Sequence, residues 1–315
     1  MKIKLKAEDR LAWLQARLSG IGASDAAAAV GLSPYKTPMQ LWAEKTGKAG
    51  APQEETEPMK WGHRLQRVVA DAFAEETARN VHDPGEFTIF EHHREPYLIA
   101  TLDYIQTIRS STMLPEKYEP EDDVAIVQVP SRMGVLEVKT AGYSKRDEWA
   151  DAPPLHYIVQ LQHQLMVTRL PFGSIAALIG GQRFVWQDIP ADEEFQIRLE
   201  YQLMRFWEYV QRDEPPPALA ADNRVLSDIF KMTNPDLLPG TGEMLAWDEQ
   251  RSRALQTIKI AERERDEAEA KLKYAIGQHS GILLPNGVRY NWTEEQRREY
   301  TVPAGVRRTL RRHES

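Results

Sequence analysis

Apolar and polar positions alternate along residues 133–140, MGVLEVKT, with the period of two that is typical of a β-strand. Successive side chains of a strand point to opposite faces, so Glu137 and Lys139 share one face, and Leu136 and Val138 share the other. Taken alone, the stretch fits a half-buried strand with one face in water. A charged pair that serves a reaction centre is the alternative.

The same kind of pattern predicts alternating helices and strands around this segment. Gly and Pro break residues 10–48 into short helices. Residues 57–79 predict a longer helix whose apolar face is marked by Leu65, Val68, Val69, Ala72 and Phe73. Two antiparallel strand pairs are also predicted, 86–93 with 97–105 and 174–181 with 183–190, and the second pair turns at Gly180-Gly181. Two further helices are predicted over residues 154–170 and 191–214.

The pattern changes after residue 214, where EPPPALAADN indicates a linker. The sequence therefore predicts a core over residues 1–214, a linker over 215–242 and a C-terminal segment over 243–315. Residues 243–278 predict a charged helix with a narrow apolar seam, made of Trp247, Ala254, Ala261, Ala268 and Ala275 at seven-residue intervals, with Ile258 and Leu272 between them. The seam suits a helical hairpin or an intermolecular contact, and a solvated helix is the alternative.

The end of the chain, from residue 287, predicts a small β-hairpin followed by a basic tail. The tail carries Arg307, Arg308, Arg311 and Arg312. It is either solvated or a contact for DNA or a partner.

Composition restricts the class of protein. The 315 residues include no cysteine, which excludes disulfides and thiolate metal sites and fits a reducing cytosol. No signal peptide and no run of about 18 apolar residues is present, so no membrane partner is expected. With a net charge of −7, binding to nucleic acid would need local basic patches or divalent cations.

Two carboxylates and a lysine suggest phosphodiester hydrolysis. Asp103 ends the predicted strand LIATLD, which would place its carboxylate at the edge of the sheet, although an aspartate there is often only a turn residue. Asp103 and Glu137 could hold Mg²⁺ through oxygen. Bound metal would neutralise the scissile phosphate and lower the pKa of the attacking water. Lys139, on the face of Glu137, could orient or deprotonate that water.

The helix after this strand carries a polar stripe of His156, Gln160, His163 and Gln164, opposite Ile158, Leu161 and Leu165. The stripe is either the wet face of an amphipathic helix or the means by which Gln160 reaches Lys139. Two histidines seven residues apart without a third ligand do not predict zinc. The polar residues from about 106 to 132 predict a loop-like insertion between Asp103 and Glu137.

Several blocks, in the same order, resemble the YqaJ-type viral recombinase and lambda exonuclease family of the PD-(D/E)XK nuclease superfamily. These blocks are WLQARLSGIGASDAAAAVGLSPY, KWGHRLQ, ATLDY, LEVKT and YIVQLQHQLMVT. The resemblance covers about residues 10–210. It implies an α/β fold with a PD-(D/E)XK restriction-endonuclease-like core, in which helices flank a central mixed β-sheet. A C-terminal helical and small β appendage would follow this core.

The resemblance also implies an activity. The family suggests a Mg²⁺-dependent deoxyribonuclease, with Mn²⁺ as a substitute, that digests one strand of linear double-stranded DNA in the 5′→3′ direction. The product would carry 3′ single-stranded overhangs for phage recombination. The expected partners are double-stranded DNA ends, a phage single-strand annealing protein and two further copies of the chain in a homotrimer. The expected location is the cytoplasm of a bacterial host that carries the phage or prophage.

By motif position, the resemblance assigns roles to individual residues. Asp103, Glu137 and the Val138 carbonyl would bind metal, and Lys139 and Gln160 would position the water. The residues assigned to the 5′ phosphate or the DNA are Arg17, Ser24, Thr101 and Tyr157. A guanidinium beside a hydroxyl suits a terminal phosphate, although a surface arginine and a helix N-cap are the alternative for Arg17 and Ser24.

The chain departs from the family pattern at three positions. Gln66 stands where the W-G-x-x-x-E box has its glutamate, and Leu102 and Tyr104 replace a proline and a glycine. Gln66 flanks the buried face of its helix and should point toward the sheet. Its amide oxygen carries no charge, so it would be a weak ligand for a second metal. The alternatives are therefore a DNA-end-binding module with weak or no catalysis, and a related nuclease of different polarity.

Overall fold

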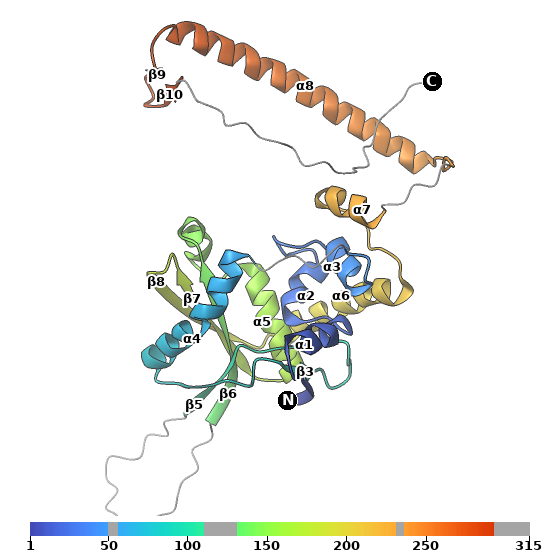
Figure 1. The fold of residues 1–315 in the computed structure, drawn as a ribbon, viewed down its shortest axis with the longest axis vertical. Coiled ribbons are helices and arrows are strands. Elements are labelled where there is room, and N and C mark those ends of the chain that lie inside the picture. Colours follow the sequence, from blue (N-terminus) through green and yellow to red (C-terminus); the bar gives the residue numbers. More distant parts are fainter. Residues whose placement is uncertain (50–55, 110–130, 231–235, 293–315) are drawn as a thin grey trace, which may run out of the picture. The chain divides into compact units, whose positions relative to one another are not determined.

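The computed structural model describes residues 1–49, 56–109, 131–230 and 236–292. The chain divides into two compact units, Met1–Lys231 and Met232–Ser315 (Figure 1). Among the described residues, no helix combines the length and the apolar character that crossing a membrane requires.

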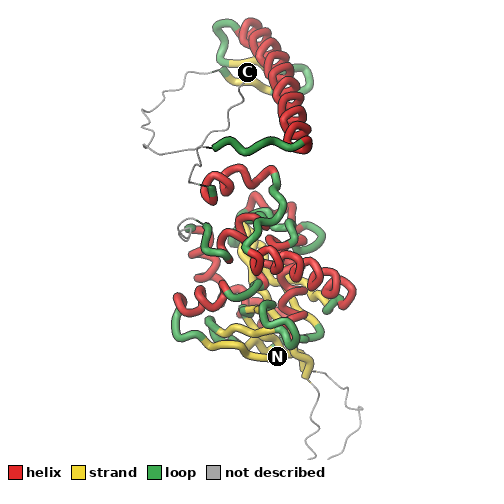
Figure 2. The backbone as a smooth tube through the Cα atoms, turned by 90° about the vertical axis from the view of Figure 1, so that its right-hand side faces the viewer, coloured by secondary structure: helices red, strands yellow, loops and turns green. Residues whose placement is uncertain are grey.

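A five-stranded mixed sheet forms the centre of the first unit (Figures 1 and 2). Its strands, in spatial order, are β2 (Asn80–His82), β5 (Tyr104–Arg109), β6 (Ser131–Ala141), β7 (Phe172–Ile179) and β8 (Arg183–Pro190). β6 and β7 are parallel and are connected through α5 (Leu155–Thr168), whereas the other neighbours are antiparallel. The hairpin from β7 to β8 turns at Gly180 and Gly181, as predicted, and both glycines have positive φ.

Helices cover both faces of this sheet. On one face, Leu136 and Val138 pack against Val69 and Phe73 of α4 (Glu57–Thr77). On the other face, α5 packs against the sheet through residues such as Leu161. Because strand side chains alternate between faces, a strand with both faces covered is buried throughout. Residues 135–138 are all buried, so the half-wet strand that the pattern of residues 133–140 first suggested is wrong.

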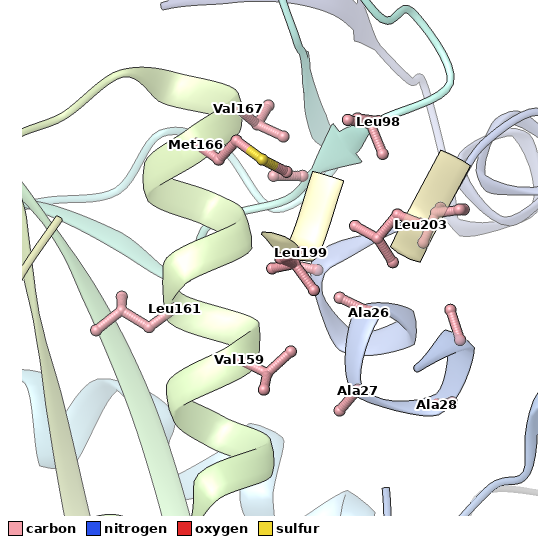
Figure 3. Packing of buried hydrophobic residues seen from close by; sticks show 14 of the residues in the cluster. Ala26, Ala27, Ala28, Leu98, Val159, Leu161, Met166, Val167, Leu199 and Leu203 are labelled. Atoms are coloured by element: carbon pink, nitrogen blue, oxygen red, sulfur yellow. The ribbon is translucent and has the colours of Figure 1, made fainter. Parts of the chain in front are cut away.

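α5 lies between the sheet and a further layer of helices (Figure 3). Leu161 points toward the sheet, while Val159 and Met166 point toward Ala27 of α2 (Ala23–Ala29) and Leu199 of α6 (Glu193–Arg212). This position makes α5 a central helix of the core, and residues 161–168 are buried without exception.

A smaller three-stranded sheet and short helices carry the N-terminal box. The sheet has the order β1 (Lys2–Lys6), β3 (Thr88–Glu91), β4 (Ile99–Ala100). The predicted short helices appear as α1 (Arg10–Leu18), α2 and α3 (Pro38–Lys45). A parallel bridge from Ile21 to Leu98 joins the loop after α1 to this sheet.

Three local predictions are corrected by the structure. The strand predicted over residues 97–105 is split, since β4 ends at Ala100 and β5 begins at Tyr104, so Asp103 precedes a strand instead of ending one. The predicted loop over 106–132 contains the paired ends of β5 and β6, and only residues 110–130 lie outside the described residues. On α4, Val68 is exposed and Ala70 is buried, because the buried face is rotated by part of a turn.

The segment predicted as a linker contains ordered structure. A 3-10 helix, η2 (Ala220–Asp222), and α7 (Asn223–Ile229) belong to the first unit, and Leu226 packs against its core. Asp222 is fully buried and accepts a hydrogen bond from Thr37 at 2.5 Å. A second 3-10 helix, η1 (Tyr143–Trp149), follows β6.

In the described part of the second unit, residues 236–292, the chain forms the predicted long helix and a hairpin. α8 spans Gly242–Ile276, and β9 (Gly281–Leu283) pairs with β10 (Arg289–Asn291). β10 falls in the predicted hairpin segment, but its partner β9 lies before it, and residues 293–315 with the basic tail lie outside the described residues. On the seam of α8, Trp247 and Ile258 are about half exposed.

Candidate active site

The site lies at an open strand edge in the centre of the sheet. β5 pairs with β6 only as far as Leu136, while β7 pairs with β6 as far as Ala141. Asp103, just before β5, lies at this free edge and accepts a hydrogen bond from the Val138 N–H at 2.9 Å. The N–H and C=O of one strand residue point the same way, so the Val138 carbonyl also faces the side of Asp103.

Glu137 is held by two amides from α5. Its side chain is 2% exposed. One carboxylate oxygen accepts a hydrogen bond from Gln160 Nε2 at 2.5 Å, and the other accepts one from Gln164 Nε2 at 2.7 Å. The two glutamines are one helical turn apart and therefore lie on the same side of α5. The polar stripe of this helix thus faces the protein interior and not solvent.

Lys139 completes the cluster. Its Nζ lies 2.5 Å from Glu137 Oε1 and 3.1 Å from Gln160 Oε1, so the predicted contact between Gln160 and Lys139 is present. The ammonium also lies 4.8 Å from the centre of the Tyr157 ring. Burial alone would lower the pKa of Lys139, but the carboxylates of Glu137 and Asp103 raise it above its ordinary value. Lys139 is therefore a cation at neutral pH.

The two carboxylates oppose one another electrostatically. Burial and the neighbouring charge of Glu137 raise the pKa of Asp103 to about 7. Lys139, the Val138 N–H and a side-chain hydrogen bond with Gln66 act in the other direction. Gln66 belongs to α4, on the opposite face of the sheet from α5, and reaches Asp103 because no β5 residue fills the edge at that level.

These groups fit one hard divalent cation. The oxygens at this edge come from Asp103, Glu137 and the Val138 carbonyl, with the neutral amide of Gln66 beside Asp103, and hard cations such as Mg²⁺ prefer oxygen ligands. Gln164 Oε1 is also buried and has no hydrogen-bond partner. In the part of the chain that the structure describes, no three or more His, Cys, Asp or Glu side chains are grouped as a metal site. The two carboxylates therefore provide enough negative charge for one divalent cation. A second cation would need a further carboxylate at the position where the chain has the neutral amide of Gln66.

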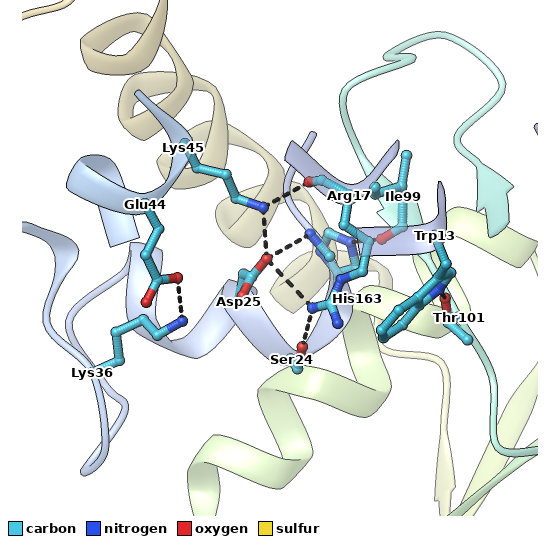
Figure 4. A network of polar contacts seen from close by, with 11 residues as sticks. Trp13, Arg17, Ser24, Asp25, Lys36, Glu44, Lys45, Ile99, Thr101 and His163 are labelled. Carbon is cyan, nitrogen blue, oxygen red and sulfur yellow. Dashed lines mark hydrogen bonds and ion pairs between the residues drawn. The ribbon is translucent and has the colours of Figure 1, made fainter. Parts of the chain in front are cut away.

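A second polar cluster lies where α1 meets α2 (Figure 4). Arg17, in the last turn of α1, donates to Ser24 Oγ at 2.7 Å, so the structure brings the two predicted residues together. The guanidinium lies 4.7 Å from the centre of the Trp13 ring. Trp13 Nε1 donates in turn to Thr101 Oγ1 at 3.0 Å, two residues before Asp103. Ser24, Arg17, Trp13 and Thr101 thus form one chain of contacts, and Gln164 Nε2 lies 3.4 Å from the Thr101 carbonyl oxygen and 2.7 Å from Glu137.

Tyr157, predicted to contact DNA, lies beside Lys139 and is half-buried. Its hydroxyl is 3.5 Å from the hydroxyl of Tyr35, which is 71% exposed. The Trp61-Gly62 box lies at the start of α4, where Trp61 is 52% exposed and Arg64 stacks on its ring. A Cβ on Gly62 would lie 3.5 Å from Thr140 Oγ1, which shows how closely this turn of α4 approaches β6.

The two histidines of α5 have other contacts. His163 Nε2 lies 3.0 Å from the Ile99 carbonyl oxygen, and burial lowers the pKa of His163 to about 4. The His156 ring packs edge-on against Tyr35, and burial together with Lys139 lowers its pKa.

Four residues in these clusters were missed by the sequence reasoning. Gln164 was noted in the polar stripe but given no role, although its position one turn after Gln160 was a usable signal. Asp25 and Lys45, which ion-pair at 2.9 Å behind Arg17, come from different helices and leave no local pattern. Tyr35 comes from the loop before α3 and likewise has no local signal.

Comparison with known proteins gives three kinds of match. Residues 12–171 match the family model of the YqaJ-like viral recombinase domain. An uncharacterised protein, YqaJ of Bacillus subtilis, is 30% identical over 198 residues, which is 62% of this chain and 54% of that protein. The chain thus spans about half the length of this curated relative.

Solved structures also resemble the chain. The alkaline exonuclease LHK-Exo of Laribacter hongkongensis is 16% identical, with a TM-score of 0.47 over 64% of this chain and 92% of that one. Its complex with dAMP gives 15% identity, the same TM-score and the same coverage. The structure of SSO0001 gives 15% identity and a TM-score of 0.38 over 75% of this chain and all of that one. The α/β core predicted from the sequence, a mixed sheet flanked by helices, is confirmed.

Proposed function

The chain belongs to the YqaJ-like viral recombinase family, and on this premise we propose that it is a Mg²⁺-dependent nuclease that digests one strand of linear double-stranded DNA from its 5′ end. The observation that carries the proposal is the clamped Glu137, with Lys139 and Asp103 beside it at an open strand edge. The product would be a duplex with 3′ single-stranded overhangs, the substrate of recombination by strand annealing.

The chemistry divides among the residues of the site. Asp103, Glu137 and the Val138 carbonyl would hold Mg²⁺, which when bound neutralises the scissile phosphate and acidifies water. Gln160 and Gln164 fix the direction of the Glu137 carboxylate. Lys139, fixed between Glu137 and Gln160, would orient the attacking water and offset negative charge as the phosphorus–oxygen bond breaks.

The Arg17 cluster would select the DNA end. A guanidinium with a neighbouring hydroxyl suits a terminal phosphate dianion. Arg17 and Ser24 form this pair, and Trp13 links Arg17 to Thr101, two residues before Asp103. We assign the 5′ phosphate to Arg17, Ser24 and Thr101. In this arrangement the ring of Tyr157 would hold the Lys139 ammonium by a cation–π contact, and its hydroxyl group would contact the DNA.

The family resemblance also supports a proposal about partners and location. We propose that the protein acts as a homotrimer with a single-strand annealing protein as partner, in the cytoplasm of a bacterium that carries the phage or prophage. A ring-shaped homotrimer would let an acidic chain bind DNA, because only the surface that lines the central channel of the ring needs to be basic.

The second candidate function is binding of DNA ends with weak catalysis. The observation that favours it is Gln66, which contributes no charge where a second cation would need a carboxylate. In that case the chain would bind ends in Mg²⁺ without degrading them, and Gln66→Glu would restore digestion.

Digestion of linear duplex labelled at its 5′ ends, in Mg²⁺, separates the two candidates. Release of labelled mononucleotides from the wild type, absent in Lys139→Ala, supports the exonuclease. Because Lys139 does not contact the phosphate cluster, Lys139→Ala should still bind DNA, which an anisotropy titration measures. An active Lys139→Ala protein would refute the assigned role, and binding without degradation by the wild type would favour the second candidate.

A further inference from the structure

Lys45 and Asp25 form a buried ion pair next to the guanidinium of Arg17 (Figure 4). We propose that Lys45 and Asp25 are positioning residues that control how strongly Arg17 binds the terminal phosphate. Lys45 neutralises Asp25 and so keeps the Arg17 guanidinium available for its ligand. The inference rests on the proposed function, because it takes the 5′ phosphate as the ligand of Arg17.

The distances show that Asp25 is paired mainly with Lys45. Lys45 Nζ lies 2.9 Å from Asp25 Oδ2, whereas the nearest nitrogen of Arg17 lies 3.7 Å from the same oxygen. The Lys45 and Asp25 side chains are 4% and 8% exposed. Arg17 is 23% exposed, so it is the member of the triad that solvent and a ligand can reach.

Lys45 also fixes the backbone from which Arg17 extends. Its ammonium donates to the Arg17 carbonyl oxygen at 2.8 Å, in addition to Asp25. The same oxygen of Asp25 lies 3.3 Å from the Gly22 N–H, at the start of α2. The end of α1, the start of α2 and the end of α3 are therefore tied together at one carboxylate.

Asp25 and a phosphate would compete for the same cation. A guanidinium prefers to bind a carboxylate through two parallel hydrogen bonds, and a buried carboxylate that has lost its nearest cation attracts the next nearest strongly. If the charge of Lys45 is removed, Arg17 should close onto Asp25. A phosphate would then have to displace a carboxylate before it could bind, although no residue that touches it has changed.

A purely structural role for the ion pair predicts a different result. In that case, variants would lose stability and would weaken binding of all DNA ends alike. The ratio of affinities for 5′-phosphorylated and 5′-hydroxyl ends separates the two explanations, because loss of folded protein lowers both affinities and leaves their ratio unchanged.

The experiment measures this ratio by fluorescence anisotropy on full-length protein, with Ca²⁺ replacing Mg²⁺ to prevent hydrolysis. The wild type should prefer the phosphorylated duplex. Lys45→Met, of similar length but without charge, should reduce the preference about tenfold, the size expected for one charge-assisted hydrogen bond. Asp25→Asn combined with Lys45→Met removes both charges, frees Arg17 again and should restore the preference.

Each outcome decides the inference. An unchanged ratio in a folded Lys45→Met protein would overturn it, and so would a double variant that folds but shows no preference. If Lys45→Met does not fold, the double variant still tests the idea, since its ratio must equal or exceed that of the wild type. Arg17→Ala is the control for the proposed function. If the preference survives in Arg17→Ala, the assignment of the phosphate to Arg17 is wrong, whatever Lys45 does.

Discussion

His163 should make the stability of the first unit depend on pH. Its ring is fully buried on α5, where Nε2 lies beside the Ile99 carbonyl and Nδ1 has no hydrogen-bond partner. Burial lowers the pKa of His163 from 6.5 to about 4 in the folded chain. Between these values the unfolded chain binds a proton that the folded chain does not, so falling pH favours unfolding.

The magnitude follows from the two pKa values. The contribution of His163 to stability is highest above pH 6.5, falls as the pH drops toward 4, and is reduced by about 3 kcal/mol once the pH is below both values. Between pH 7 and pH 5 the expected loss is about 2 kcal/mol. Asp103, whose pKa is raised to about 7, contributes in the opposite direction over this range, so the effect of His163 is read as a difference between the wild type and a variant of His163 alone.

The matched variant is His163→Gln, whose amide can donate to the Ile99 carbonyl but does not titrate. Urea unfolding at pH 7 and pH 5, followed by tryptophan fluorescence, gives the free energy of unfolding of both proteins. The wild type should lose about 2 kcal/mol more than the variant between the two pH values. The reasoning is refuted if both proteins lose the same amount, or if an NMR titration places the pKa of His163 at or above 6.5.

Three further predictions test the site and its scaffold. Gln164→Leu should weaken Mg²⁺ binding at least about tenfold in a calorimetric titration, because it releases one oxygen of the clamped carboxylate, and an unchanged affinity would rule out that role. Gln66→Glu should lower the Mg²⁺ concentration needed for half-maximal digestion, since a third carboxylate favours a second cation; an identical metal dependence would argue against Gln66 as a ligand position. Gly20→Ala should destabilise the fold by about 1–3 kcal/mol, because a Cβ there would lie 2.4 Å from the Tyr97 carbonyl oxygen. Gly62→Ala is its control in a thermal melt of both variants, because that glycine is in a helix with only ordinary contacts and its replacement should be neutral or stabilising; an equal loss in both variants would contradict the steric argument.

Local patterns predicted the elements that carry the site. The alternation in residues 133–140 predicted the central part of β6 and placed Glu137 and Lys139 on one face, where they do contact each other. The polar stripe predicted the side of α5 from which Gln160 reaches Lys139. The shared blocks supported Asp103, which no periodicity connects to Glu137 because Asp103 lies just before β5 and Glu137 lies in β6.

The burial of the site residues and their contacts with distant parts of the chain could not be predicted from the sequence. A period of two is the same in a strand with one wet face and in a strand covered on both faces, so only the packing of α4 and α5 showed that Glu137 is buried. For the same reason, the stripe on α5 was compatible with solvent until Gln160 and Gln164 were seen to contact Glu137, and His163 the Ile99 carbonyl.

The sequence by itself determined most of the elements and, through the shared blocks, the family, and it supplied the residues that are proposed for the site. Tertiary structure alone decided that Asp103 lies between two sheets at a free edge of β6, that Gln164 holds Glu137, and that Lys45 neutralises Asp25 behind Arg17. The physical reason is that periodicity is set by the geometry of one element. The charge balance of a buried site is set by side chains from several elements, which only the folded chain brings within hydrogen-bonding distance.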